Sequence, residues 1–213
     1  MSKGKKSKRK QQVQKSVETP IVKDTRTVEL RPISWIVFAV LAALCFWRFG
    51  LTWVCLRNWI FLCCLYALSV TDLETMLIPN RYLIIPAVTW CICCFLIPMT
   101  KNEILMHFAA GVAYGGGILC ISLIMDRILK RDTMGGGDIK LFAVCGLYLG
   151  FIGTLLAVIF ACVIGLIFVV ARKKKDESGS KEFPFGPSIA VASGMMLLFG
   201  QPLIDMYLSL LQH

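Results

Sequence analysis

Residues 151–171 read FIGTLLAVIFACVIGLIFVVA, an apolar run that contains no charged side chain. A helix of roughly 20 such residues, rising about 1.5 Å each, crosses the hydrocarbon core of a bilayer. The whole chain is also rich in apolar residues, because 57% of its 213 residues are hydrophobic and only 17% are charged. Soluble domains are usually about 45–50% apolar and about 25% charged. The sequence therefore predicts an all-α polytopic membrane protein.

Seven apolar segments are predicted to be transmembrane helices. The fifth is short for a full crossing, the last is interrupted by Pro202, and Gly150 with Gly153 could form a tight turn between the fifth and sixth. The predicted bounds are 33–53, 57–72, 81–99, 105–127, 139–149, 151–171 and 186–211.

A basic tail precedes the first apolar segment. Residues 1–31 hold ten of the 23 Lys and Arg, and no aromatic residue is interleaved with them, as a single-strand nucleic-acid binder would require. We expect residues 1–32 to be a disordered cytoplasmic tail that contacts anionic lipid and binds no nucleic acid, and residues 33–213 to form the membrane domain.

The distribution of positive charge predicts the orientation of the chain. With the tail inside and seven crossings, the internal segments hold 20 Lys and Arg and the external segments hold 3. Such an excess is typical of cytoplasmic segments. We therefore expect a multi-pass protein of the cell inner (plasma) membrane with a cytoplasmic N-terminus.

The cysteines and histidines give no sign of a metal site. The ten cysteines fall almost entirely within apolar segments, and the Cys91–Cys94 pair has no second C-x-x-C pair in a polar loop to complete four zinc ligands. The chain has no His-Glu-x-x-His sequence, and its two histidines, His107 and His213, are interpreted as bystanders. No metal and no cofactor are predicted.

Two isolated acids, Asp72 and Asp138, each lie at the end of an apolar run on the predicted cytoplasmic side. An acid beside hydrocarbon is costly and points to function. Two carboxylates about 3 Å apart cannot both ionise, so they share a proton and can supply both the base and the acid that peptide hydrolysis requires. A proton-coupled transporter that uses the two acids as a relay is the alternative.

Three glycines, Gly135, Gly136 and Gly137, come directly before Asp138. Without side chains, the backbone here could adopt positive φ, lie close to an extended substrate and act as a hinge. A glycine run by itself is equally typical of a turn.

These motifs resemble those of the type IV prepilin peptidases. Gly135–Lys140 resembles the family's G-x-G-D-x-K element, and Asp72 followed by Met76–Asn80 resembles its first motif, an aspartate before Ile-Pro-Asp or Ile-Pro-Asn. Phe183–Ala190 resembles the Pro-Phe-Gly-Pro stretch that opens the last span. The three matches occur in the family's order and cover roughly residues 55–210.

The resemblance implies a membrane-embedded aspartic endopeptidase. Its substrates would be prepilins or pseudopilins, whose short basic leader ends in glycine before a long hydrophobic helix, and cleavage would occur at the cytoplasmic face. By the same resemblance, Asp72 and Asp138 would be the catalytic dyad, and Gly135, Gly136 and Gly137 would shape a substrate-facing loop.

For other residues near these motifs, the predicted roles are less specific. Acidic Glu74 or Asp132 could meet the basic leader, and Lys140 could steady a carboxylate or a lipid phosphate, or serve only as a positive-inside anchor. Pro79–Asn80 is predicted to end a loop and start the third span.

The sequence departs from the longer, bifunctional members of the family. Those carry a cytoplasmic zinc-binding loop with two C-x-x-C pairs, associated with N-methylation of the product, whereas here only about three residues separate the first two spans. Thr71 precedes the first aspartate, where the related presenilin-type enzymes usually have Tyr. The resemblance therefore favours the prepilin branch and implies peptidase activity, with methylation in doubt.

Overall fold

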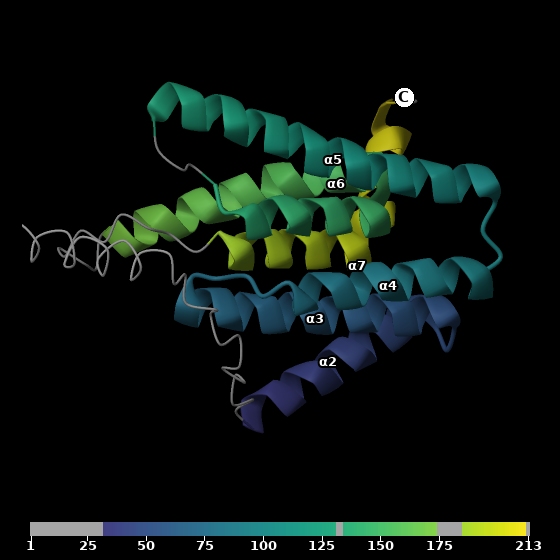
Figure 1. The fold of residues 1–213 in the computed structure, drawn as a ribbon. Helices are drawn as coiled ribbons and strands as arrows, with labels where there is room; N and C mark the ends of the chain where they lie inside the picture. The colour runs from purple at the N-terminus through teal and green to yellow at the C-terminus, as the bar shows by residue number, and fades with distance from the viewer. Residues whose placement is uncertain (1–31, 131–133, 174–184, 212–213) are drawn as a thin grey trace, which may run out of the picture. The chain divides into compact units, whose positions relative to one another are not determined.

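The long apolar segments form helices, and short links join them. The computed structural model describes residues 32–130, 134–173 and 185–211, and all regular secondary structure in these ranges is helical. The predicted basic tail, apart from residue 32, lies outside the described residues. The helices are α2 (Pro32–Phe49), α3 (Trp53–Thr75), α4 (Arg81–Leu96), α5 (Lys101–Leu129), α6 (Gly136–Lys173) and α7 (Gly186–Leu211), shown in Figure 1.

Helix α6 is broken at Gly150. Its φ of 67° and ψ of −168° lie in a region that is essentially restricted to glycine. Residues 136–149 and 151–173 therefore form two helical halves, which run in opposite directions beside each other (Figure 1). This confirms the break predicted between the fifth and sixth segments, although Gly153 lies within the helix that follows.

Side chains of α5 hydrogen-bond to backbone carbonyls of α6 around this break. The carbonyl of Leu147, whose helical partner would be the N–H of Phe151, instead accepts a hydrogen bond from His107 Nδ1 at 2.9 Å. Tyr114 donates to the carbonyl of Phe151 at 2.7 Å. An unpaired carbonyl in hydrocarbon costs several kcal/mol, so His107, interpreted as a bystander to the chemistry, has a structural role at this break.

Glycines bring α5 and α6 into close contact. A Cβ on Gly146 would lie 2.6 Å from the Cα of Gly111, and one on Gly115 would lie 2.7 Å from the Cβ of Ala143. Gly111 and Gly115 are four residues apart, and small residues at this spacing allow helix backbones to approach closely in lipid. Gly111, Gly115 and Gly146 therefore serve packing within the chain.

Capping accounts for differences between the predicted and observed bounds. Helix α3 begins at Trp53, four residues before the predicted start, because Thr52 accepts a hydrogen bond from the N–H of Cys55 at 3.2 Å. Helix α5 begins at Lys101 because Thr100 and Glu103 form a capping box.

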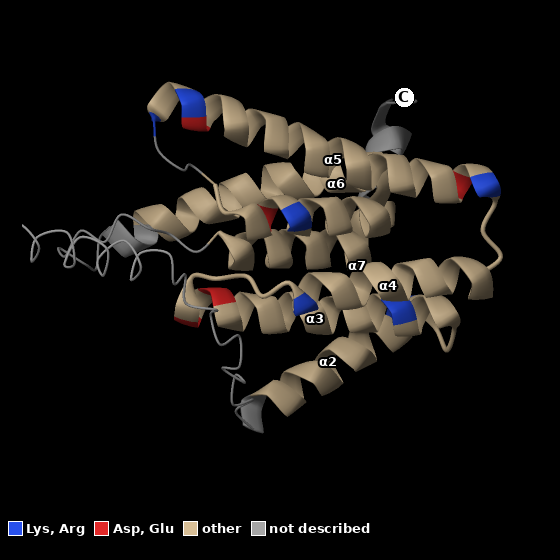
Figure 2. Ribbon diagram, in the orientation of Figure 1, with Lys and Arg blue, Asp and Glu red and all other residues tan. Residues whose placement is uncertain are grey.

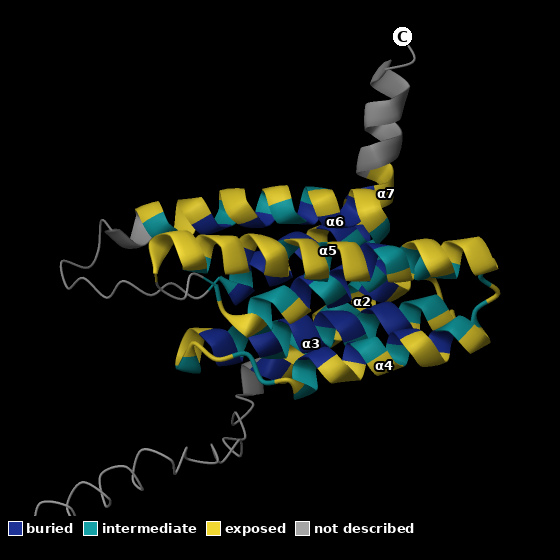
Figure 3. Ribbon diagram, turned by 45° about the horizontal axis from the view of Figure 1, so that its top comes forward, coloured by how far each residue is buried: buried dark blue, intermediate teal, exposed yellow. Residues whose placement is uncertain are grey.

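The outer surface has the character of a membrane protein. Large apolar side chains are exposed on many helices, including Phe95 at 92% and Trp47 at 74%. Figure 3 shows exposed residues in yellow along several of the helices. Charged residues lie near the helix ends (Figure 2). Among the described residues, three helical segments have the length and hydropathy to cross a membrane: Trp53–Thr75, Lys101–Leu129 and Gly136–Val170, the last of which includes the break.

Candidate active site

Asp72 and Asp138 lie at the same end of the helix bundle, where α3 ends and α4, α6 and α7 begin. Asp72 is in the last turn of α3 and is 5% exposed, and Asp138 is in the first turn of α6 and is partly buried. The two carboxylates are close enough to interact electrostatically. The fold therefore brings together two acids that are 66 positions apart in the sequence.

The carboxylate of Asp72 is held by the start of α7. Its Oδ2 accepts a hydrogen bond from the backbone N–H of Gly186 at 3.0 Å. Gly186 is the first residue of α7, where N–H groups have no intrahelical partner and the helix dipole favours a carboxylate. This contact fixes one oxygen of Asp72 and leaves the other available for chemistry.

Gly186 must be glycine for this contact to form. A Cβ at this position would lie 2.7 Å from Asp72 Oδ2 and 3.1 Å from its Cγ, both closer than ordinary van der Waals contact. Sequence reasoning gave Gly186 no role. The glycine within the Phe183–Ala190 stretch was the available signal, but sequence spacing alone could not pair it with an acid in another helix.

Asp138 has an unsatisfied polar atom. Its Oδ1 is buried and makes no hydrogen bond to any described residue, while its backbone N–H donates to the carbonyl of Gly135 at 3.1 Å. A buried acceptor without a partner is costly, and such atoms call for a functional explanation. Asp138 Oδ1 is therefore suited to accept a hydrogen bond from a water or a substrate.

The three glycines before Asp138 do not adopt the backbone conformation expected of them. None has positive φ, because Gly136 and Gly137 already belong to the first, right-handed turn of α6. Gly137 instead permits close packing, since a Cβ there would lie 2.6 Å from the Cβ of Ile78 in the link between α3 and α4. The expectation of positive φ at Gly135, Gly136 and Gly137 is thus wrong, and close approach is what Gly137 provides.

Lys140 and Glu74 lie on the exposed rim of this site. Lys140 Nζ donates to Asn80 Oδ1 at 2.9 Å, so its observed neighbour is an amide rather than a carboxylate. Asn80 is at the N-cap of α4, as predicted, but its side chain makes no capping hydrogen bond. Glu74 is exposed at the end of α3, and Asp132 lies outside the described residues.

Two nearby carboxylates can hydrolyse an amide bond by general acid–base catalysis. The described residues contain no group of three or more His, Cys, Asp or Glu side chains placed to hold a metal ion. All ten cysteines are unpaired thiols, and several of them are buried in the helix packing.

Comparisons with known proteins agree with this chemistry. The model of the type IV leader peptidase family matches residues 59–170, a range that contains both acids. The chain is 30% identical over 185 residues to a prepilin leader peptidase/N-methyltransferase of Bacillus subtilis, covering 84% of this chain and 70% of that protein.

More distant relatives carry the same name. The protein from Xanthomonas campestris is 26% identical and that from Pseudomonas aeruginosa is 25% identical. Each match covers 83% of this chain but only 61% of the relative, so the chain spans less than two thirds of the length of these two proteins. No solved structure matches significantly.

Proposed function

Because this chain belongs to the type IV leader peptidase family, we propose that it is a membrane-embedded aspartic endopeptidase that removes the short basic leader from type IV prepilins or pseudopilins. The observation that carries the proposal is the placement of Asp72 and Asp138, from separate helices, at the same end of the bundle and within the region that the family model matches. The family match gives no support to the alternative of a proton-coupled transporter.

The proposed mechanism assigns Asp72 and Asp138 as the catalytic pair. One carboxylate, ionised, takes a proton from a water as the water oxygen attacks the scissile carbonyl carbon. The other, protonated, gives its proton to the leaving amide nitrogen as the C–N bond breaks. Gly186 holds Asp72 in orientation, and the unpartnered Oδ1 of Asp138 offers a site for the water.

The residues around the pair would contact the substrate. Gly135, Gly136 and Gly137 would line the approach to Asp138. The exposed carboxylate of Glu74 would meet the positive charges of the leader, a contact worth about 0–1 kcal/mol at a solvated surface.

We further propose seven membrane crossings with a cytoplasmic N-terminus, in the inner (plasma) membrane of the cell. The break at Gly150 supports this count, because it makes two antiparallel segments of α6. Residues 136–149 rise only about 21 Å, so Asp138 would lie slightly below the membrane surface on the cytoplasmic side. The basic tail, residues 1–32, would contact anionic lipid at that surface.

The proposal is limited to the peptidase step. The names of the relatives include N-methyltransferase activity, but only Gly50–Thr52 links α2 to α3, where the longer members of the family carry their zinc-binding loop. The mass of the product, measured with and without S-adenosylmethionine, would decide whether methylation also occurs.

Cleavage by the purified protein tests the proposed function. The chain is reconstituted in lipid with a prepilin whose basic leader ends in glycine, and the new N-terminus of the product is sequenced. We expect a single cut after that glycine, and little cutting when the glycine is replaced by a bulky residue. No cleavage by folded protein would contradict the proposal.

A labelling experiment tests the orientation separately. A cysteine introduced at Glu74 should react with an impermeant thiol reagent only from the cytoplasmic side. Labelling from the outside would contradict the proposed topology without bearing on the peptidase reaction.

A further inference from the structure

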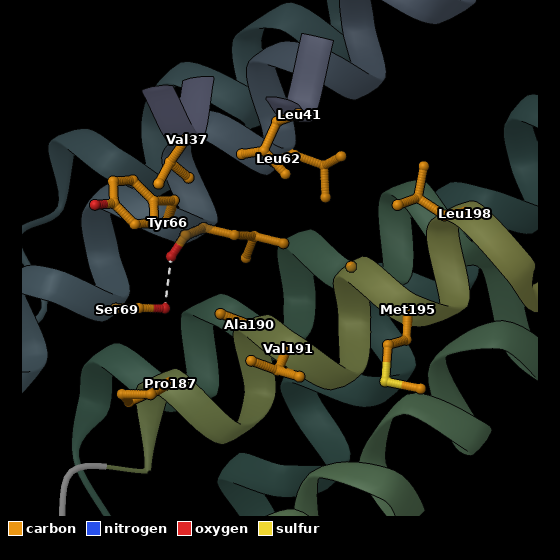
Figure 4. A pocket seen from close by; sticks show the side chains of 12 residues that line it. Val37, Leu41, Leu62, Tyr66, Ser69, Pro187, Ala190, Val191, Met195 and Leu198 are labelled. Atoms are coloured by element: carbon orange, nitrogen blue, oxygen red, sulfur yellow. Dashed lines mark hydrogen bonds between the residues drawn. The ribbon is translucent and has the colours of Figure 1, made fainter. Parts of the chain in front are cut away.

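A cavity of about 280 Å³ lies among α2, α3 and α7. Its lining is almost entirely apolar and includes Val37 and Leu41 of α2, Leu62 of α3 and Leu198 of α7 (Figure 4). The hydroxyl of Ser69, which also lines it, already donates to the carbonyl of Leu65 at 2.8 Å. We call this space the α2/α7 groove, and its surface suits an apolar occupant.

A hydrogen bond joins α2 to α7 beside Leu198, at one end of the groove. Arg48 Nε donates to the carbonyl of Leu198 at 3.1 Å, and this is the carbonyl that Pro202 leaves without its helical partner. From there, α2 slants away from α7 toward its own N-terminal end (Figure 1). The other end of the groove, lined by Ser69 and Pro187, lies toward the end of the bundle that contains the acids.

This end of the groove lies beside the candidate active site. Ser69 precedes Asp72 by one turn of α3, and Pro187 directly follows Gly186, whose N–H is bonded to Asp72. From Pro187 to Leu198 the groove wall extends about 16 Å along α7. A polypeptide cut at Asp72 could thus continue as a helix directly into the groove.

We propose that the α2/α7 groove binds the apolar helix that follows the scissile bond of the substrate. This inference rests on the proposed function, which supplies such a helix. In lipid, helices associate through close van der Waals packing rather than through the hydrophobic effect. The groove offers such contacts, because Val191 and Met195 of α7, which are 51% and 48% exposed, line it and can pack against the side chains of a second helix.

A matched pair of substitutions tests the groove. Val191 lines it and is 51% exposed, whereas Val163 of α6 is 50% exposed and is not among the groove residues. The activities of the Val191→Trp and Val163→Trp proteins are measured as kcat/KM on a full-length prepilin and on a short peptide that carries the leader and the cut site but no helix.

We expect Val191→Trp to lower the ratio of kcat/KM for the prepilin to that for the peptide by about tenfold, through a rise in KM. Val163→Trp should leave this ratio at the wild-type value. An unchanged ratio in Val191→Trp would overturn the groove proposal while leaving the peptidase function intact. If the wild-type protein cuts neither substrate, the proposed function fails, and the groove proposal fails with it.

Photo-crosslinking identifies the occupant. A benzoylphenylalanine at Met195, which lines the groove, is placed in a chain that also carries Asp72→Asn, so that substrate is bound but not cut. We expect crosslinks to the first turns of the substrate helix. Crosslinks to lipid alone, in the presence of excess prepilin, would show that the groove holds an acyl chain and would overturn the proposal.

Discussion

Substitution of Gly186 by alanine tests how the site positions Asp72. The added Cβ would lie 2.7 Å from Asp72 Oδ2, whereas ordinary contact begins at 3.4 Å, so the carboxylate or the start of α7 must shift by about 0.7 Å. The 3.0 Å hydrogen bond from the Gly186 N–H would be strained or lost as a result. A misplacement of about 1 Å at a reacting group can reduce the rate about a hundredfold.

We therefore expect Gly186→Ala to reduce kcat/KM on a leader-bearing substrate by between about tenfold and a hundredfold. Gly186→Val should reduce it further, because the cause is steric. The assay follows release of the leader in lipid or detergent, and the thermal unfolding midpoint is recorded for each protein.

Gly117 provides the control, since a Cβ on this α5 glycine meets no atom within 4 Å. Gly117→Ala should keep kcat/KM within about twofold of the wild-type value. If Gly186→Ala is equally active, the contact between α7 and Asp72 does not position the catalytic group, and the reasoning is refuted. A loss of activity that only follows a loss of folded protein would refute it as well.

Two further substitutions test close packing and backbone strain. A Cβ on Gly137 would lie 2.6 Å from that of Ile78, whereas a Cβ on Gly136 meets nothing within 4 Å. Gly137→Ala should therefore lower kcat/KM at least about tenfold more than Gly136→Ala. Equal effects of the two substitutions would show that this packing is unimportant. Gly150→Ala should lower the free energy of unfolding by about 1–3 kcal/mol, because alanine is strained at φ 67° and ψ −168°. A denaturant titration measures this free energy, with Gly117→Ala as the matched control. An equal free energy of unfolding in the two variants would contradict the strain.

Much of the fold could be predicted because the signals are local. Runs of apolar residues give helices whatever they pack against, and the break at Gly150 follows from a glycine between two such runs. The predicted helix bounds were less accurate, because they depend on single capping hydrogen bonds, such as the one that Thr52 accepts from the N–H of Cys55. The role of His107 was missed for a different reason, since its partner Leu147 is 40 residues away.

The site was predicted in part. Asp72 and Asp138 were selected as candidates because an acid at the edge of an apolar run is conspicuous in a sequence. Gly186 was not paired with Asp72, because a contact between residues 114 positions apart cannot be inferred from sequence spacing. The conformation of the glycines before Asp138 was misjudged because the helix begins at Gly136, and a glycine inside a helix serves close packing rather than positive φ.

The most direct test of the account is cleavage by Asp72→Asn, Asp138→Asn and the double variant, compared with the wild-type protein on one prepilin. Asparagine keeps the shape of each side chain but removes its ability to exchange a proton. Because the proposed mechanism requires both acids, each single variant should lose activity as completely as the double variant, with the helical content and unfolding midpoint retained. Cleavage near the wild-type rate by either single variant would show that the two carboxylates do not carry out the reaction together.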